Sequence, residues 1–404
     1  MKKISLFLLA VSALFLTLSC TNEEPEQPAP TSLTAAEQGV YLNHVAVSAL
    51  NMLTPEVYAP LAKAEADLEH FSADSLMKAN SEMSAMILMS LMQMLVNDTT
   101  LIFDPYVFAG TYDIATDYGM TFQPGEKAVQ VIYASPLQHY KLEVAFSQAA
   151  VVIPTFDQLA PLMQTIGMGG AHLYIKLPVQ TQLTLSADNL PPIALEINLS
   201  ADLHAGLEQF DATQDVIRID AEISYLDFAL TGFVELAEGK LDGEWVFSQM
   251  GNPVAGGDFL VSDLVFSNGL PVASGQGEMN VSMMNAVRCR ITVPNALQVA
   301  VQAFQAMQES GCERTEASTG LLVAMMNLVS TGKVSYDTYE DQADLFFYSA
   351  ELPQIGWMVL PGLIIDDCRY TLANIEELMT TEAVNALLMK VGGLFSNILL
   401  ARTN

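Results

Sequence analysis

The chain has 404 residues, of which 51% are hydrophobic and only 15% are charged, and its formal net charge at pH 7 is −30. This composition supports a large buried core and excludes global disorder, while the negative charge disfavours nucleic acids and anionic headgroups as partners. No second linker rich in proline or charge divides the residues after the N-terminal segment, so we expect one domain with appended helices.

The first residues have the pattern of an export signal. Met1, Lys2 and Lys3 give a basic start, and the run from Ile4 to Leu18 is apolar apart from two serines and a threonine. The run is about fifteen residues long, shorter than the roughly 20 that cross a bilayer as a permanent helix. We therefore expect residues 1–19 to be a signal peptide that is removed, which takes the net charge from −30 to −32.

The apolar run ends at Leu16-Thr17-Leu18-Ser19-Cys20, which resembles the lipobox of bacterial lipoprotein precursors. The resemblance implies that the precursor is cut before Cys20, that Cys20 is acylated, and that its lipid anchors the protein to a membrane. Thr17 departs from the leucine that usually stands three residues before the cysteine. An ordinary signal peptide, with Cys20 as a bystander, is the alternative.

Residues 20–33 are expected to form a disordered tether behind the lipidated cysteine. Three prolines and three glutamates lie between Thr21 and Pro30, a composition that cannot build a packed core. The early acids also resemble the export signal of some Bacteroidota lipoproteins. That resemblance implies a lipid-anchored location in the outer membrane, at the cell surface or on the periplasmic face.

Residues 34–98 are predicted to be helical. Thr34-Ala35-Ala36-Glu37 matches a capping box, and the helix that it starts should end near Leu53. Thr54-Pro55-Glu56 indicates a second helix start, with proline at the first helical position. Ser72 to Asn97 is predicted as a third helix. Its methionines Met83, Met86, Met89 and Met92 are spaced three apart, which is more typical of core packing than of an adaptable ligand surface.

Residues 99–350 are predicted to form a long antiparallel sheet with inserted helices. Apolar side chains alternate with polar ones over 173–187, 193–207 and 217–225, which is the period of a strand with one buried face. The apolar set moves to even positions at Tyr225 to Phe228, which predicts a bulge. Further strands are expected at 101–110, 128–134, 140–152, 244–250, 258–267, 270–283, 288–293 and 333–350, with Asn268-Gly269 as a turn.

The predicted fold class is α+β, with a long, curved antiparallel sheet, a half-barrel-like meander, packed against N-terminal and C-terminal helices. Residues 351–404 would supply the C-terminal helices, at 371–379 and 381–400. Inserted helices are expected at 157–166, 294–310 and 321–329. Helices that cover the apolar face incompletely would leave room for an apolar ligand. The likeness to lipid-binding proteins of the cell envelope is one of fold alone.

Three cysteines remain if Cys20 carries lipid: Cys289, Cys312 and Cys368. Cys312 and Cys368 both have the character of loop positions that flank helices, so they are the pair predicted for a disulfide in an oxidising compartment. Three reduced cysteines that pack as small apolar residues are the alternative.

Motifs that carry catalysis or metal binding are largely missing. The sequence has no G-x-S-x-G, no H-E-x-x-H, no phosphate-binding Gly-Lys-Ser/Thr loop and no EF-hand loop. Ser75-Leu76-Met77-Lys78 matches S-x-x-K but lacks the accompanying K-T-G. The five histidines show no helical pairing, and Asp211, Asp215, Asp366 and Asp367 are expected in turns and caps. We assign no catalytic, cofactor-binding or metal residue and expect no cofactor.

The sequence favours a membrane-anchored lipoprotein of the cell envelope that binds or carries an apolar or extended ligand without catalysis. A hydrolase that uses loop carboxylates is one alternative, because two acids at a suitable distance need no local motif. A structural partner in an outer-membrane complex is another, and the sequence predicts no particular protein partner.

Overall fold

The computed structural model describes residues 32–69, 95–97, 100–103, 109–114, 120–125, 128–134, 139–154, 172–203, 214–267, 270–298, 315–352 and 356–403. The chain divides into two compact units. The first unit comprises residues 1–58, 240–265 and 271–400, and the second comprises residues 59–239, 266–270 and 401–404. The expected signal peptide and Cys20 lie outside the described residues, as does all but the end of the expected tether.

The first unit combines antiparallel strands with most of the helices. Its neighbouring strands follow the order β22-β21-β20-β19-β18-β17-β14-β13 and are all antiparallel. The strands are β13 (Lys240–Gln249), β14 (Asn252–Val261), β17 (Gly277–Met283), β18 (Val287–Val293), β19 (Thr331–Tyr336), β20 (Tyr339–Leu352), β21 (Gly356–Ile365) and β22 (Cys368–Tyr370). The helices are α2 (Ala35–Met52), α7 (Glu316–Val329), the 3-10 turn η3 (Ile375–Glu377) and α8 (Thr381–Thr403), whose last residues fall in the second unit.

The second unit follows the order β4-β3-β5-β6-β9-β10-β11-β12, antiparallel except for the parallel pair β3–β5. These strands are β3 (Gly110–Ile114), β4 (Met120–Pro124), β5 (Ala128–Ala134), β6 (His139–Phe146), β9 (Gln180–Ala187), β10 (Leu190–Asp202), β11 (Val216–Tyr225) and β12 (Phe228–Ala237). A separate sheet orders β1 (Leu95–Asn97), β2 (Thr100–Phe103), β8 (His172–Pro178) and β7 (Ala150–Pro154) as β1-β2-β8-β7. Helix α3 (Pro55–Glu69) lies mainly in this unit. The short strands β15 (Val265–Ser267) and β16 (Leu270–Ala273) pair only with each other, and their residues are divided between the two units.

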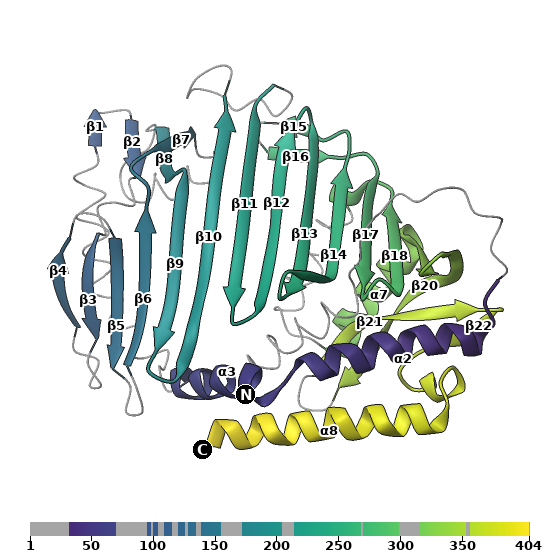
Figure 1. Ribbon diagram of the computed structural model, residues 1–404. Helices are drawn as coiled ribbons and strands as arrows, with labels where there is room; N and C mark the ends of the chain where they lie inside the picture. The colour runs from purple at the N-terminus through teal and green to yellow at the C-terminus, as the bar shows by residue number, and fades with distance from the viewer. Residues whose placement is uncertain are drawn as a thin grey trace. The chain divides into compact units, whose positions relative to one another are not determined.

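The predicted fold class is confirmed, since long antiparallel strands dominate the described residues and a few helices accompany them. Strands β9 to β12 lie side by side in Figure 1. Strands β9, β10 and β11 correspond to the three predicted alternating segments, and β12 follows β11 in the sequence. Strand β5 occupies the predicted residues 128–134. The predicted strand over 173–187 is interrupted at Val179, because β8 and β9 belong to different sheets.

The bulge predicted at Tyr225 to Phe228 is wrong, because this segment is a hairpin turn. Tyr225 and Phe228 are directly opposite each other on β11 and β12, and Leu226 takes a positive φ of 52°. Opposite residues of an antiparallel pair point to the same face, and here they are three apart in sequence. An apolar face that continues across the turn must therefore move from odd to even positions.

The prediction of helices throughout 351–404 is also wrong. Residues 356–365 and 368–370 form β21 and β22, and the predicted helix at 371–379 is a turn that contains only η3. Burial outweighs the helix signals, because the apolar residues of β21 complete the sheet beside β20, where Leu360 and Ile365 are buried. The predicted helix at 381–400 is confirmed as α8.

Two further predicted helices fall partly or wholly in the described residues. The segment 321–329 lies within α7, as predicted. Leu95–Asn97, the end of the helix predicted over 72–97, is the strand β1, and the rest of that helix lies outside the described residues, as do 157–166 and most of 294–310. A three-residue segment at the end of a periodic run fits either structure, so pairing with its sheet partner β2 decides.

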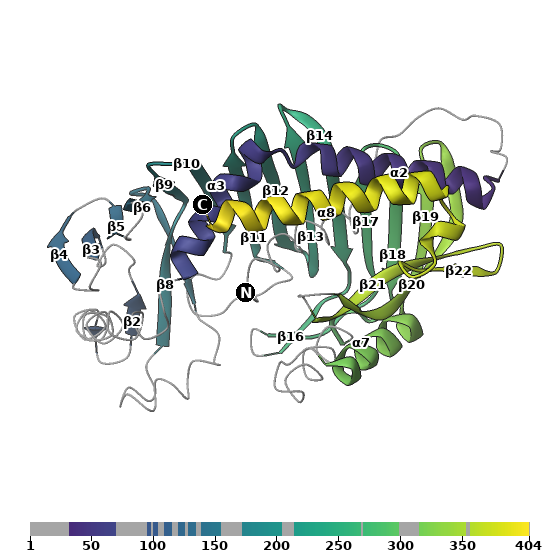
Figure 2. The same cartoon turned by 90° about the horizontal axis from the view of Figure 1, so that it is seen from below.

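Helix α2 begins at the capping box that the sequence predicts. The Thr34 backbone N–H donates to Glu37 Oε2 at 2.8 Å, and the Thr34 side chain accepts from the Glu37 backbone N–H at 3.4 Å. The helix then covers the apolar side of the first unit, where Tyr41 packs against buried Tyr336, and Val45 lies among Ala255 and Met283. Figure 2 shows α2 running beside α8, and Lys390 Nζ donates to Asn51 Oδ1 at 2.6 Å between them.

We expect Gly39→Ala to destabilise the protein, because a Cβ at Gly39 would collide with the backbone carbonyl of Leu378. Such overpacking costs about 1 to 3 kcal/mol. Gly320→Ala in α7 is the matched control, since a Cβ added at Gly320 would meet nothing within 4 Å and alanine favours a helix by roughly 1 kcal/mol. Thermal unfolding should show a lower Tm for Gly39→Ala and an unchanged or higher Tm for Gly320→Ala. Equal effects of the two substitutions would contradict the close packing of α2 against Leu378.

We expect the Cys289 thiol to resist alkylation in the folded protein. Burial raises its pKa to about 12, so the reactive thiolate is scarce at pH 8. Iodoacetamide labelling at pH 8, followed by mass spectrometry, should leave Cys289 unmodified until denaturant is added. Labelling of Cys289 in the native protein at the rate of an ordinary exposed thiol would show that the core beneath α2 is open.

Candidate apolar binding face

The strand register of the second unit gathers apolar side chains on one face of β9 to β12. Ile193, Leu195, Ile197, Leu199 and Ala201 of β10 are opposite Tyr225, Ile223, Ala221, Ile219 and Ile217 of β11. The same rows continue onto β12 as Phe228, Leu230, Gly232, Val234 and Leu236, and onto β9 as Leu185 and Leu183. We call this surface the apolar face; it is the one-sided pattern that the sequence predicts over 173–225.

Helix α3 covers one end of the apolar face. Ala64 is buried with Ile114, Tyr140 and Leu190, and Leu61 packs against this cluster together with Leu185, Ile193 and Tyr225. The Tyr140 hydroxyl donates to the Ala64 carbonyl oxygen at 3.5 Å. This end of the face is therefore part of the core of the unit.

Further along the strands, aliphatic side chains of the same face remain in contact with solvent. Ile219 is 43% exposed, Ile223 is 40% exposed and Val234 is 42% exposed. Ile219 and Val234 are directly opposite each other on β11 and β12, so their exposed atoms form one surface. Singly exposed aliphatic residues are ordinary, whereas neighbouring ones on a regular face are a candidate for a site of interaction.

The opposite pairs of residues across β11 and β12 form rows on the apolar face, and these rows differ in the size of their side chains. Ile219 and Val234 form one row, Ile223 and Leu230 form another, and between them lies the pair Ala221 and Gly232. The two tall rows are four residues apart along β11, which corresponds to about 13 Å. An elongated apolar group can contact aliphatic side chains on both sides of the low row.

The apolar face offers hydrophobic contact and almost no hydrogen bonding. Strands β9, β10 and β11 each have a paired neighbour on both sides, so their backbone N–H and C=O groups are used in the ladders. Of the side chains on the face, only those of Thr181 and Tyr225 carry a polar group between β9 and β12. The surface therefore suits hydrocarbon better than a ligand whose polar groups need partners.

The opposite face of the same strands carries a polar network. Glu196 accepts hydrogen bonds from Gln180 Nε2 at 2.8 Å, from Asn198 Nδ2 at 3.1 Å and from Gln182 Nε2 at 3.2 Å. These amides lower the pKa of the Glu196 carboxyl, with the Asn198 hydrogen bond the largest cause. Nearby, Arg218 pairs with Asp220 at 2.8 Å and stacks on the Phe233 ring. This face is hydrated, which leaves the apolar face as the candidate site.

Several sequence-predicted positions fall outside the described residues. Cys20 and Cys312 are among them, so lipidation and the Cys312–Cys368 disulfide remain predictions; Cys368 itself is exposed on β22. The Ser75 to Lys78 motif, Asp211, His70 and His204 also lie outside the described residues.

Of the acids that are described, Asp366 and Asp367 occupy the expected turn position, whereas Asp215 does not. Asp366 and Asp367 form the turn between β21 and β22 with φ values of 49° and 64°, as predicted for turn residues. Asp215 directly precedes β11 and is buried, with 1% of its surface exposed. Across the part of the chain that the structure describes, no three residues among His, Cys, Asp and Glu are arranged to hold a metal ion.

Comparison with known proteins gave no match to a family model, to a curated protein or to a solved structure. Among the described helices, none combines the length and the apolar character that a bilayer-crossing helix needs. The function of the apolar face therefore has to follow from its own geometry.

The signal for the apolar face was present in the sequence as alternation, but its exposed part could not be predicted. Alternation identifies which side chains share a face and contains no information on which of them a helix will cover. The position of α3 over Tyr140 and Leu190, instead of over Ile219 and Val234, depends on tertiary packing.

We expect Asn198→Ala to raise the pKa of Glu196 towards its ordinary value, because it removes the largest cause of the lowered value. The sign follows from linkage: a carboxyl with a lowered folded-state pKa adds stability above its unfolded pKa and loses it as the pH falls through the folded value. A carbon-13 NMR titration of the Glu196 carboxyl measures the shift directly. Asn189→Ala, in the β9–β10 turn, is the control, and identical titration of Glu196 in both variants would refute the amide network.

Proposed function

We propose that the protein is a membrane-anchored lipoprotein of the cell envelope that binds or carries an apolar ligand on the apolar face and is not an enzyme. The observation that carries the proposal is the partial exposure of the opposite pair Ile219 and Val234, and of Ile223 further along β11, on a face whose other members are almost all apolar. Covering each of these side chains with a ligand would contribute about 1 kcal/mol, so a chain that contacts several of them gains useful affinity.

The chemistry of the apolar face favours a hydrocarbon chain over an extended peptide. A peptide that lay on it would lose water from its backbone N–H and C=O groups without gaining partners, since those of β9 to β11 are already paired. Each such unpaired group costs about 1 to 3 kcal/mol. An acyl chain has no N–H or C=O groups along its length, so its contact with the apolar face carries no such desolvation cost.

The proposed location rests on the N-terminal sequence. The basic start, the apolar run and the lipobox-like end at Cys20 favour export and lipid anchoring, and the acids behind Cys20 favour the outer membrane. A short proline-rich tether would keep the binding unit near the membrane surface, where apolar ligands are found. The anchored chain would then take up or deliver its ligand at that surface.

A binding assay with the neutral fluorophore N-phenyl-1-naphthylamine tests the proposed function. The wild-type protein is expected to bind the probe saturably, and the double substitution Ile219→Gln with Val234→Gln should weaken binding about tenfold, which corresponds to roughly 1.4 kcal/mol. Glu222→Gln, on the opposite face of β11, is the matched control and should bind as the wild type does. Wild-type affinity in the double variant, with far-UV circular dichroism unchanged, would refute the apolar face as the binding site.

A further inference from the structure

The polar face of the first unit contains an arginine with unusual surroundings. The strand register aligns four residues in one row across four strands: Gly256 of β14, Ser282 of β17, Arg288 of β18 and Ser335 of β19. Neighbours in such a row are about 5 Å apart at their Cα atoms. Arg288 is therefore the one long side chain in this row, with a serine on each side.

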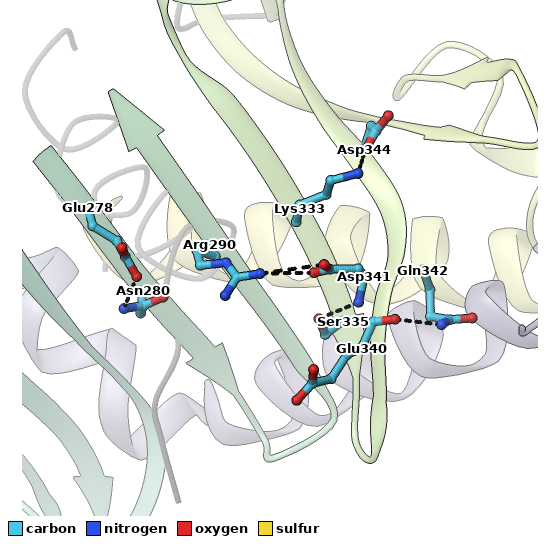
Figure 3. Close-up of polar contacts among 9 residues, drawn as sticks. All are labelled: Glu278, Asn280, Arg290, Lys333, Ser335, Glu340, Asp341, Gln342 and Asp344. Atoms are coloured by element: carbon cyan, nitrogen blue, oxygen red, sulfur yellow. Dashed lines mark hydrogen bonds and ion pairs between the residues drawn. The ribbon is translucent and has the colours of Figure 1, made fainter. Parts of the chain in front are cut away.

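The neighbouring cations are paired with carboxylates, whereas Arg288 has no such partner in the part of the chain that the structure describes. Figure 3 shows Arg290 directed at Asp341, with Nη2 to Oδ1 at 3.3 Å, and Lys333 directed at Asp344, with Nζ to Oδ1 at 2.5 Å. Arg290 lies two residues from Arg288 on the same strand face. Among the described residues, no carboxylate pairs with Arg288, and its Nε is buried with no hydrogen-bond partner.

An unpaired guanidinium is unexpected in a chain that has 46 acids and only 16 basic residues. A buried N–H without an acceptor is destabilising, and native proteins rarely leave one. The guanidinium edge formed by Nε–H and a neighbouring Nη–H fits the two oxygens of a carboxylate or a phosphate group. An oxyanion would supply the acceptor that the Arg288 Nε–H lacks among the described residues.

We propose that Arg288, flanked by Ser282 and Ser335, is a binding site for a singly charged oxyanion, either a carboxylate or a phosphodiester group. This proposal is independent of the proposed apolar ligand, since its residues lie in the other unit. The oxyanion accepts the Nε–H and Nη–H of Arg288. Ser335 Oγ accepts the Asp341 backbone N–H at 3.0 Å, which leaves its own hydroxyl hydrogen to donate to the anion.

The local charges select an anion of low charge. Asp341 and Asp344 pair with Arg290 and Lys333 in the adjacent row, so Arg288 is the cation of this region that has no carboxylate partner among the described residues. The net charge of the chain, −30, repels polyanions over longer distances. A monoanion needs only the single guanidinium of Arg288 as its partner. Nucleic acids and polyphosphates carry more negative charge than this one cation balances, and the net negative charge of the chain repels them.

Isothermal titration of the full-length protein with acetate, and separately with dimethyl phosphate, tests the site, with sodium chloride at matched ionic strength as the reference. Saturable binding of either anion to the wild-type protein is expected, and the anion that binds identifies the chemistry of the natural ligand. Arg288→Gln should weaken that binding at least about tenfold, because it removes the charge and the paired donors. Arg369→Gln is the matched control, since Arg369 lies on the same face and stacks on the Phe346 ring, and it should leave binding unchanged.

Thermal unfolding without added anion provides a second readout that also shows whether the variant folds. Arg288→Gln should be no less stable than the wild-type protein, because the buried Nε has no partner to lose. Binding of neither anion to the wild-type protein would overturn the proposal, as would equal binding to Arg288→Gln.

Discussion

The two-residue period of strands β9 to β12, locked in register by antiparallel pairing, is the constraint on which the rest of the structure depends. Because Ile193, Ile223 and Leu230 must all point to one side, the second unit has an apolar face whether or not a helix covers it. A shift of one residue would turn every one of these side chains to water. The same rule orders the first unit, where α2 covers the apolar side with Tyr41 and Val45.

The two units meet that constraint in different ways. In the first unit, Val334, Tyr336 and Val281 have at most 1% of their surface exposed. In the second, α3 buries Tyr140 and Leu190, while Ile219 and Val234 keep about two fifths of their surface in solvent. The apolar side chains named in the first unit are thus buried, whereas those named in the second unit are partly exposed. The partial exposure of the apolar face in the second unit, and not its hydrophobic composition alone, supports a binding role for it.

Strand alternation and capping were readable from sequence because both are local. The pattern over 217–225 predicts β11 closely, and Thr34 with Glu37 predicts the start of α2. The errors are at positions where a tertiary partner decides: β21 forms because β20 provides an edge, and the shift at Tyr225 reflects a hairpin that local pattern cannot distinguish from a bulge. The Arg288 row was unpredictable for the same reason, since it joins strands far apart in sequence.

Photo-crosslinking with a diazirine-labelled fatty acid, followed by peptide mass spectrometry, tests the central claim most directly. If the exposed part of the apolar face binds hydrocarbon, the modified residues will lie within 217–223 and 230–236, and unlabelled fatty acid will compete. Crosslinks spread over the chain without competition, or confined to the polar face of the same strands, would contradict the claim that the one-sided register creates a binding surface.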